Sequence, residues 1–336
     1  MRIILTGASG LIGTNLALRL MDEGHEVFGV DKDPNPWTDR VPVHIEDLRT
    51  SGHDTGAAWV RGDVVVHFAA RAKVHESVIR PENALENYVI THNALEYCRR
   101  TNTPIIFGSS RETYGEQSTF PVPEDAVRLE GAASPYAASK LADEALIHSY
   151  GRCYGLPYII FRFSNVYGRY DDLARNGRFV PLLCQKIPLG EPITIFGPQK
   201  AYDFTYIDDA IDGVTRGIER LVHTPEAVSG HAINLGYGQG TTLLEAAQYV
   251  ARAAGVEPSF ILGKMRPGEI SRYVADLTKA RALLGYDPKY PASRGIPLAY
   301  QWWREWYAPL DTERSPQRIP ARASLSAALS PVPAAA

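Results

Sequence analysis

Tyr136 and Lys140 form a Tyr-x-x-x-Lys spacing within a stretch of helical periodicity. Residues four apart lie on one face of a helix, so the phenol and the ammonium group would lie side by side. The lysine charge lowers the pKa of a neighbouring phenol, and the phenolate can accept a proton from a substrate hydroxyl during hydride transfer. The same lysine can hydrogen-bond a nicotinamide ribose. The pair therefore predicts proton transfer coupled to hydride transfer, although the spacing alone is common on surface helices.

A glycine-rich turn, GASGLIG at residues 7–13, lies between a predicted strand and a predicted helix. Gly7 permits the tight turn, Gly10 lets a pyrophosphate approach the backbone, and Gly13 lets the helix pack closely on the sheet. The anion would lie at the helix N-terminus, where free N–H groups and the helix dipole favour it. The turn predicts a dinucleotide site formed by Gly7, Ser9, Gly10, Leu11, Ile12 and Gly13.

Asp31 ends the next predicted strand. A carboxylate there can bind both hydroxyls of an adenosine ribose and would repel a 2′-phosphate, so NAD is favoured over NADP. The neighbouring Lys32 weakens this preference slightly. After the third predicted strand, Asp47 and Leu48 are candidates for contact with the adenine edge. A helix N-cap is the alternative interpretation of Asp47.

The first half of the chain alternates short apolar runs with amphipathic stretches. The near-continuous apolar runs at residues 63–69 and 104–108 are typical of strands buried on both faces, which favours a parallel sheet. Further strands are expected at residues 2–6, 26–31 and 158–163, and helices at residues 11–23, 81–99 and 136–150. This alternation predicts an α/β fold with a doubly wound parallel sheet.

After about residue 165 glycine and proline become frequent and the regular alternation ends. We expect residues 1–165 to form an NAD-binding Rossmann domain, to which residues 202–218 return. A smaller, interleaved α/β substrate lobe is expected from residues 166–201 and 219–310. The last segment, residues 311–336, is rich in Pro, Ala, Ser and Arg and indicates a disordered tail.

The composition excludes several classes of protein. The 35 Lys and Arg residues nearly balance the 38 Asp and Glu residues, so the net charge of −3 gives no global signature of nucleic-acid or membrane binding. The three cysteines, Cys98, Cys153 and Cys184, lie far apart, which predicts neither a disulfide framework nor a metal site. Because the N-terminus does not resemble a signal peptide, we expect a cytoplasmic protein.

In combination, these motifs resemble those of extended short-chain dehydrogenases/reductases, and within them the nucleotide-sugar epimerase/dehydratase branch, over residues 1–307. The motifs that carry the resemblance are GASGLIG at 7–13, Asp31, HFAA at 67–70, SSRETYG at 109–115, YAASK at 136–140, RFSNVYG at 162–168 and RPGE at 266–269. The resemblance implies that bound NAD⁺ takes a hydride from a sugar carbon, usually C4, while Tyr136 removes the hydroxyl proton. The hydride then returns. It also implies a homodimer formed through the helices near residues 85–99 and 136–150.

The same resemblance assigns further residues. Ser110 matches a Ser/Thr that hydrogen-bonds the same substrate oxygen as Tyr136, and Asn165 matches a substrate contact. Arg266 matches an arginine that pairs with the nucleotide diphosphate, with a surface arginine as the alternative. The remaining cofactor contacts implied are Phe68, Ala69, Ala70, Asn87 and Ser109, and the remaining substrate contacts are Lys73 and Val180.

Arg111 and Glu112 depart from the pattern. Related hexose 4,6-dehydratases carry Asp and then Glu at these positions, whereas simple 4-epimerases usually carry small residues. Glu112 argues for proton chemistry at C5, but Arg111 removes the usual acid. Three interpretations of Arg111 stay open: it pairs with Glu112, it binds a uronate carboxylate, or it faces away from the site.

Tyr202 is the second departure, because relatives commonly place a diphosphate-binding arginine there. Lys200 is a candidate substitute, as a point charge rather than a fork, and the Arg-rich loop at residues 169–178 is another. We therefore predict an NAD-dependent 4-epimerase of a UDP-hexose or UDP-hexuronate. The alternatives are a dehydratase that uses Glu112 as a base, with an atypical nucleotide or nucleoside substrate, a uronate decarboxylase, and a non-catalytic NAD-binding regulator.

Overall fold

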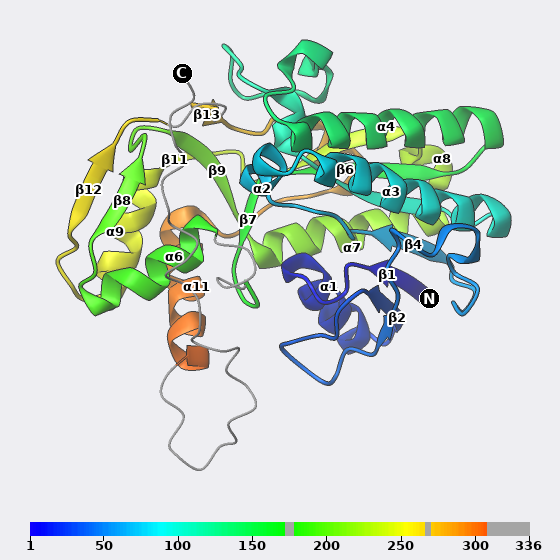
Figure 1. Cartoon of the computed structure of the whole chain (residues 1–336), viewed down its shortest axis with the longest axis horizontal. Helices are drawn as coiled ribbons and strands as arrows, with labels where there is room; N and C mark the ends of the chain where they lie inside the picture. Colours follow the sequence, from blue (N-terminus) through cyan, green and yellow to red (C-terminus); the bar gives the residue numbers. More distant parts are fainter. Residues whose placement is uncertain (172–177, 266–269, 308–336) are drawn as a thin grey trace.

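The computed structural model describes residues 1–171, 178–265 and 270–307 (Figure 1). The predicted diphosphate ligand Arg266 and the predicted tail at residues 311–336 lie outside the described residues, as does most of the loop at 169–178.

Seven parallel strands form the large sheet, in the order β10-β6-β5-β4-β1-β2-β3. Their bounds are β1 Arg2–Thr6, β2 Glu26–Asp31, β3 Val43–Ile45, β4 Val64–His67, β5 Ile105–Ser110, β6 Tyr158–Phe163 and β10 His231–Leu235. All four residues of β4 and all six of β6 are buried, as the continuous apolar runs predicted. The prediction of a doubly wound parallel sheet is confirmed.

Helices cover both faces of this sheet (Figure 1). Successive side chains of a strand point to opposite faces. Accordingly Ile3 lies in one core with residues of α1 (Leu11–Asp22) and α7 (Ile207–His223), whereas Ile4 lies in a second core with residues of α3 (Glu82–Thr101) and α4 (Pro135–Tyr154). The predicted helices at 11–23, 81–99 and 136–150 correspond to α1, α3 and α4.

The second lobe contains two small sheets (Figure 1). A four-stranded sheet joins β7 Asn165–Tyr167, β9 Ala201–Tyr206, β11 Gly240–Thr242 and β13 Arg272–Tyr273, and β8 Ile193–Phe196 pairs with β12 Phe260–Gly263. The remaining helices are α2 Val74–Ile79, α6 Phe179–Lys186, α8 Pro225–Val228, α9 Leu243–Ala254, α10 Thr278–Leu284 and α11 Ala292–Tyr307.

The chain crosses between the lobes more often than expected. Strand β10 pairs with β6 in the large sheet, although residues 219–310 were expected in the substrate lobe. Strand β9 lies in the four-stranded sheet, although residues 202–218 were expected to return to the first domain. We propose a division in which α7, which contains residues 207–218 of the predicted returning segment, and β10 belong to the first domain, whereas β9 belongs to the second lobe.

A cluster of aromatic rings joins the two lobes. We call Trp37, Tyr170, Trp302 and Trp306 the tryptophan cluster. Trp37, between β2 and β3, lies 5.8 Å from Trp302 and 5.5 Å from Trp306 on α11, measured between ring centroids. Trp302 and Trp306 stack at 5.4 Å, and Tyr170 lies 5.3 Å from Trp302. The cluster therefore connects a loop of the large sheet to α11.

Among the described helices, none combines the length and the apolar composition needed to cross a membrane.

Candidate active site

The glycine-rich turn follows β1 at the point where the strand order reverses, with β2 on one side of β1 and β4 on the other. Ligands of such sheets bind at this point, beyond the carboxyl ends of the strands. Gly7 has a φ of +76°, and a Cβ on it would lie 2.8 Å from the backbone nitrogen of Ala69. A Cβ on Gly13 would lie 2.0 Å from the carbonyl oxygen of Gly7. A Cβ on Gly10 would meet that oxygen only at 3.4 Å.

These distances fit a bound dinucleotide. Gly7 and Gly13 are required by the fold of the turn itself, because a side chain at either position would collide with backbone atoms. Gly10 has room for a side chain in this structure, so a close approach by a ligand backbone explains its glycine better than the fold does.

Asp31 ends β2 beside this turn. Its carboxylate accepts hydrogen bonds from the backbone nitrogens of Ser9 and Asp33, each at 3.1 Å. Burial raises the pKa of Asp31, and these two hydrogen bonds oppose that effect. Lys32 pairs with Asp33 at 2.5 Å. Asp31 is thus held next to the glycine-rich turn, where its predicted ribose contact would require it.

Asp47 and Leu48 follow β3. The carboxylate of Asp47 pairs with Arg49 at 2.6 Å, which lowers the pKa of Asp47. No described helix begins at Asp47, so the N-cap alternative is wrong. Leu48 is buried, and its carbonyl accepts a hydrogen bond of 2.7 Å from Asn93. The adenine contact stays a prediction.

The loop after β4 carries Phe68, Ala69 and Ala70. The backbone nitrogen of Ala69 donates to the hydroxyl of Thr6 at 3.2 Å, which fixes the loop to the end of β1. Asn87 is 1% exposed; its amide accepts from the backbone of Arg71 at 2.6 Å and donates to Ser139 at 3.1 Å. The structure therefore places Asn87 as a support of this loop, and its cofactor contact stays a prediction.

Helix α4 carries Tyr136 and Lys140 one turn apart, and both are buried. Ser134 caps the helix by accepting from the backbone of Ala137 at 3.1 Å, and Pro135 occupies the first turn, where its fixed φ is favourable. The hydroxyl of Ser110, at the end of β5, hydrogen-bonds the phenol of Tyr136. The structure thus places Ser110 beside Tyr136, with Lys140 one turn further along α4, and their catalytic roles stay predictions.

The pKa of Tyr136 is raised, whereas the Tyr-x-x-x-Lys spacing predicted that it would be lowered. Burial raises the pKa of Tyr136 to about 12, the Ser110 hydrogen bond lowers it, and the nearby Glu112 raises it. Ser110 and Arg178, rather than the predicted Lys140, lower the pKa of Tyr136, and desolvation outweighs both. Burial also lowers the pKa of Lys140, whose ammonium donates to the carbonyl of Gly108 at 3.0 Å.

A buried ion pair between Glu144 and Arg162 links α4 to β6 next to Tyr136 and Lys140. Glu144, four residues after Lys140 on α4, accepts two hydrogen bonds from Arg162 on β6, at 2.7 and 3.0 Å. It also accepts the hydroxyl of Ser109 at 2.5 Å, so the predicted cofactor contact of Ser109 would use other atoms of that residue. Arg162 donates further to Tyr114 at 3.1 Å. This network fixes α4, β5 and β6 relative to one another.

Arg111 lies beside the catalytic candidates and pairs with Glu112 at 2.9 Å. Of the three interpretations of Arg111, this pairing is the one observed. Its Nε donates to Asn165 at 2.9 Å, and its guanidinium lies 4.4 Å from the ring centroid of Tyr202. The side chain is 10% exposed, and its Nη1 donates to no described residue.

Tyr202 therefore has a cation beside it, but this cation, Arg111, comes from the short 3-10 helix at Arg111–Tyr114 that follows β5. The hydroxyl of Tyr202 donates to the carbonyl of Ile270 at 2.6 Å. Lys200 is 6% exposed, with its ammonium 6.0 Å from the Tyr202 ring centroid. Val180 is buried on α6, and Lys73 pairs with Glu76 at 2.5 Å on α2.

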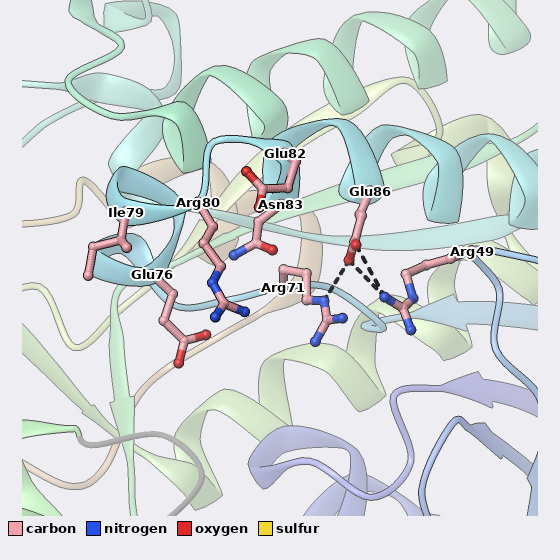
Figure 2. Close-up of a pocket in the computed structure, with 8 residues that line it drawn as sticks. All are labelled: Arg49, Arg71, Glu76, Ile79, Arg80, Glu82, Asn83 and Glu86. Atoms are coloured by element: carbon pink, nitrogen blue, oxygen red, sulfur yellow. Dashed lines mark hydrogen bonds and ion pairs between the residues drawn. The ribbon is translucent and has the colours of Figure 1, made fainter. Parts of the chain in front are cut away.

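A polar cavity of about 520 Å³ is lined by Arg49, the partner of Asp47, and by Arg71, whose backbone bonds Asn87 (Figure 2). It lies against α2, the start of α3 and the loops that follow β3 and β4. Figure 2 shows Arg49 and Arg71 reaching Glu86 from two sides, at 3.2 and 2.8 Å. Three arginines and three glutamates line it, so its charge is balanced and it marks no anion site.

Sequence reasoning missed Asp143 and Glu144. Both are acidic residues in the otherwise mostly apolar stretch LADEALI, and both are buried. A carboxylate is seldom buried without a partner, and Asp143 lies three residues after Lys140, on the same face of the helix. That spacing was the available signal. Among the described residues, no group of His, Cys, Asp or Glu could hold a metal ion.

Comparisons with known proteins agree with this geometry. Residues 3–236 match the model of the NAD dependent epimerase/dehydratase family. A probable UDP-glucuronate 4-epimerase of Rhizobium meliloti is 30% identical, over 91% of this chain and 98% of its own length.

Two solved structures are similar over most of both chains. The Bacillus cereus UDP-glucuronic acid 4-epimerase, solved with UDP-glucuronic acid and NAD, has a TM-score of 0.81 and 29% identity, covering 91% of this chain and all of its own. The Thermotoga maritima UDP-glucose 4-epimerase, solved with UDP-glucose, has a TM-score of 0.82 and 27% identity, covering 91% and 99%. These matches confirm the predicted enzyme class, the Rossmann fold and the NAD cofactor. The chain belongs to the NAD-dependent epimerase/dehydratase family.

Proposed function

We propose that this enzyme is a 4-epimerase of a UDP-hexose or a UDP-hexuronate. The observation that carries the proposal is the pairing of Glu112 with Arg111 beside the Ser110–Tyr136 pair. The relatives named above act on both kinds of sugar, and they are 4-epimerases in each case.

In this proposal Tyr136 removes the proton of the C4 hydroxyl, and Ser110 holds the same oxygen through its hydroxyl. Lys140 supplies positive charge next to the phenol. When bound, NAD⁺ would supply the reversible hydride acceptor that oxidation and reduction at C4 require. Gly7, Gly10 and Gly13 would hold its pyrophosphate, and Asp31 its adenosine ribose.

The remaining assignments are proposals of the same kind. Asn165, Lys200 and Tyr202 line the substrate side, near Arg111. The other residues proposed to contact cofactor or substrate are Ser9, Leu11, Ile12, Lys32, Asp47, Leu48, Phe68, Ala69, Ala70, Asn87, Ser109, Lys73, Val180 and Arg266.

The ion pair between Glu112 and Arg111 disfavours the alternative in which Glu112 acts as the base in an elimination of water. To remove a proton from C5, Glu112 would become neutral and leave the side chain of Arg111, 10% exposed, without its counter-ion. Breaking a buried ion pair in this way costs several kcal/mol, about 3–5 in measured cases. An epimerase needs no such proton transfer, because its only proton moves between the C4 oxygen and Tyr136.

The test is incubation of the purified enzyme with UDP-glucose and, separately, with UDP-glucuronate in deuterium oxide, followed by proton NMR. We expect C4 inversion of one substrate with no deuterium at C5 and no loss of water. Tyr136→Phe should abolish inversion, whereas Tyr154→Phe, an exposed tyrosine on the same helix, should not. Loss of water with deuterium uptake at C5, abolished by Glu112→Gln, would establish the dehydratase instead.

We also propose that the enzyme is a homodimer formed through α3 and α4. These helices lie side by side on one face of the sheet (Figure 1), and they expose Leu85, Tyr88 and Tyr154 to solvent by 67%, 38% and 56%. Light scattering should give twice the chain mass of 37.0 kDa. Leu85→Glu should reduce that mass to the monomer value, and a monomeric wild type would contradict the proposal.

A further inference from the structure

Asp143 is a fully buried carboxylate that the proposed reaction does not use. It lies on α4 with 0% exposure, and its Oδ2 is 3.9 Å from the ammonium nitrogen of Lys140. The hydroxyl of Thr91, on α3, approaches the carboxylate and favours its charged form. Neither carboxylate oxygen, however, has a full hydrogen bond to a described residue. A buried charge in this condition needs a reason.

The groups around Lys140 explain why a carboxylate is buried beside it, because no other described group there balances the charge of the ammonium. Glu144 also faces Lys140, but its two oxygens are taken by Arg162 and Ser109. His67, on β4, stays neutral because burial lowers its pKa to about 3. On β5, the ring of Phe107 lies 4.4 Å from the ammonium, and Gly108 contributes a carbonyl.

The groups around Tyr136 do not compensate Lys140 either. Glu112 is paired with Arg111, and the charge that faces the phenol from Arg178 is positive. Asp143 is therefore the carboxylate near Lys140 that has no cation of its own among the described residues.

We propose that Asp143 is a positioning residue that keeps Lys140 charged and directed at the active site. The role of Lys140 in catalysis rests on the proposed function, but its pairing with Asp143 does not. Lys140 donates to Gly108 on one side and faces Asp143 one helical turn away, so the ammonium is held between β5 and α4. Asp143 itself does not contact the proposed substrate position.

The proposal predicts a large change in the pKa of Lys140. An opposite charge within about 4–6 Å shifts a pKa by about 1–3 units toward the charged form. Burial already lowers the pKa of Lys140, and Asp143 is the first group that opposes this effect. In Asp143→Asn, Lys140 should therefore lose its proton at a pH about 1–3 units lower than in the wild type.

The direct test is NMR of the enzyme labelled with ¹³C at the lysine ε-carbon. The chain has only eight lysines, and the Lys140 signal is assigned by its loss in Lys140→Arg. We expect its titration midpoint to move down by about 1–3 pH units in Asp143→Asn. Asp143→Glu, which keeps the negative charge, should keep the Lys140 midpoint close to that of the wild type. Asp209→Asn, which replaces a buried aspartate bonded to the backbone of Lys289 and Tyr290, is the matched control and should leave the midpoint unchanged.

The pH profile of epimerisation gives the functional readout. In Asp143→Asn the alkaline fall of kcat should move down by the same amount, with little change in KM. An unchanged Lys140 midpoint in Asp143→Asn would overturn the inference. If no UDP-sugar is turned over but the midpoint moves, the proposed function fails and the inference stands.

Discussion

Replacing Asp143 with asparagine should make the folded protein more stable while it impairs catalysis. Burial raises the pKa of Asp143 to about 6, against an ordinary value of 3.8. The folded state therefore binds this proton more tightly than the unfolded state does. Stability is lost as pH rises from about 4 to about 6, and the full penalty remains above that window. A difference of about 2 pKa units corresponds to about 3 kcal/mol.

Asparagine cannot ionise and so avoids this penalty. Urea unfolding should show Asp143→Asn more stable than the wild type by up to about 3 kcal/mol at pH 8, with the difference vanishing near pH 4. Asp276→Asn should behave in the opposite way, because a hydrogen bond from Thr278 lowers the pKa of Asp276 in the folded state. A difference for Asp143→Asn that is independent of pH, or a less stable variant at pH 8, would refute this reasoning.

Three other substitutions test the remaining parts of the site. Gly13→Ala should weaken NAD binding by at least tenfold in calorimetry, because its Cβ would lie 2.0 Å from the Gly7 carbonyl oxygen; wild-type affinity would show that the turn can adjust. Arg162→Met should cost about 3–5 kcal/mol in urea unfolding, because it leaves Glu144 buried without its cation. A loss below about 1 kcal/mol would contradict that. Arg111→Leu should lower kcat/KM for epimerisation at least tenfold in a coupled assay, and unchanged kinetics would remove Arg111 from the site.

The elements of the large sheet were predictable because local sequence is sufficient to define them. Strands β2 and β6 begin and end at the predicted residues, 26–31 and 158–163. Strand β6 is buried at every position and apolar at all but Arg162, and β2 is an apolar run between the charged Glu26 and Asp31, so the limits of both are visible in the sequence. The Tyr136–Lys140 spacing was informative for a similar reason, since helical geometry alone puts the two side chains together.

Long-range pairing was not predictable in the same way. In the sequence, strand β10 lies among segments of the second lobe, yet it pairs with β6 at the edge of the large sheet. Nothing within residues 231–235 specifies that neighbour. The direction of the Arg111 side chain was left open, because adjacency to Glu112 in sequence does not decide whether two side chains meet. The same applies to Glu144, whose partner Arg162 is 18 residues away.

The tryptophan cluster should give the protein an intrinsic circular-dichroism signal. Three of its five tryptophans lie within this cluster, and Trp302 and Trp306 are stacked with an interplanar angle of 16°. Aromatic rings this close couple their electronic transitions, so the pair should produce an exciton signal in ultraviolet circular dichroism that depends on ring geometry. Trp37 sits on the loop that follows Asp31, whereas its partners sit on α11. Movement of the second lobe relative to that loop would therefore be visible spectroscopically in the unlabelled protein.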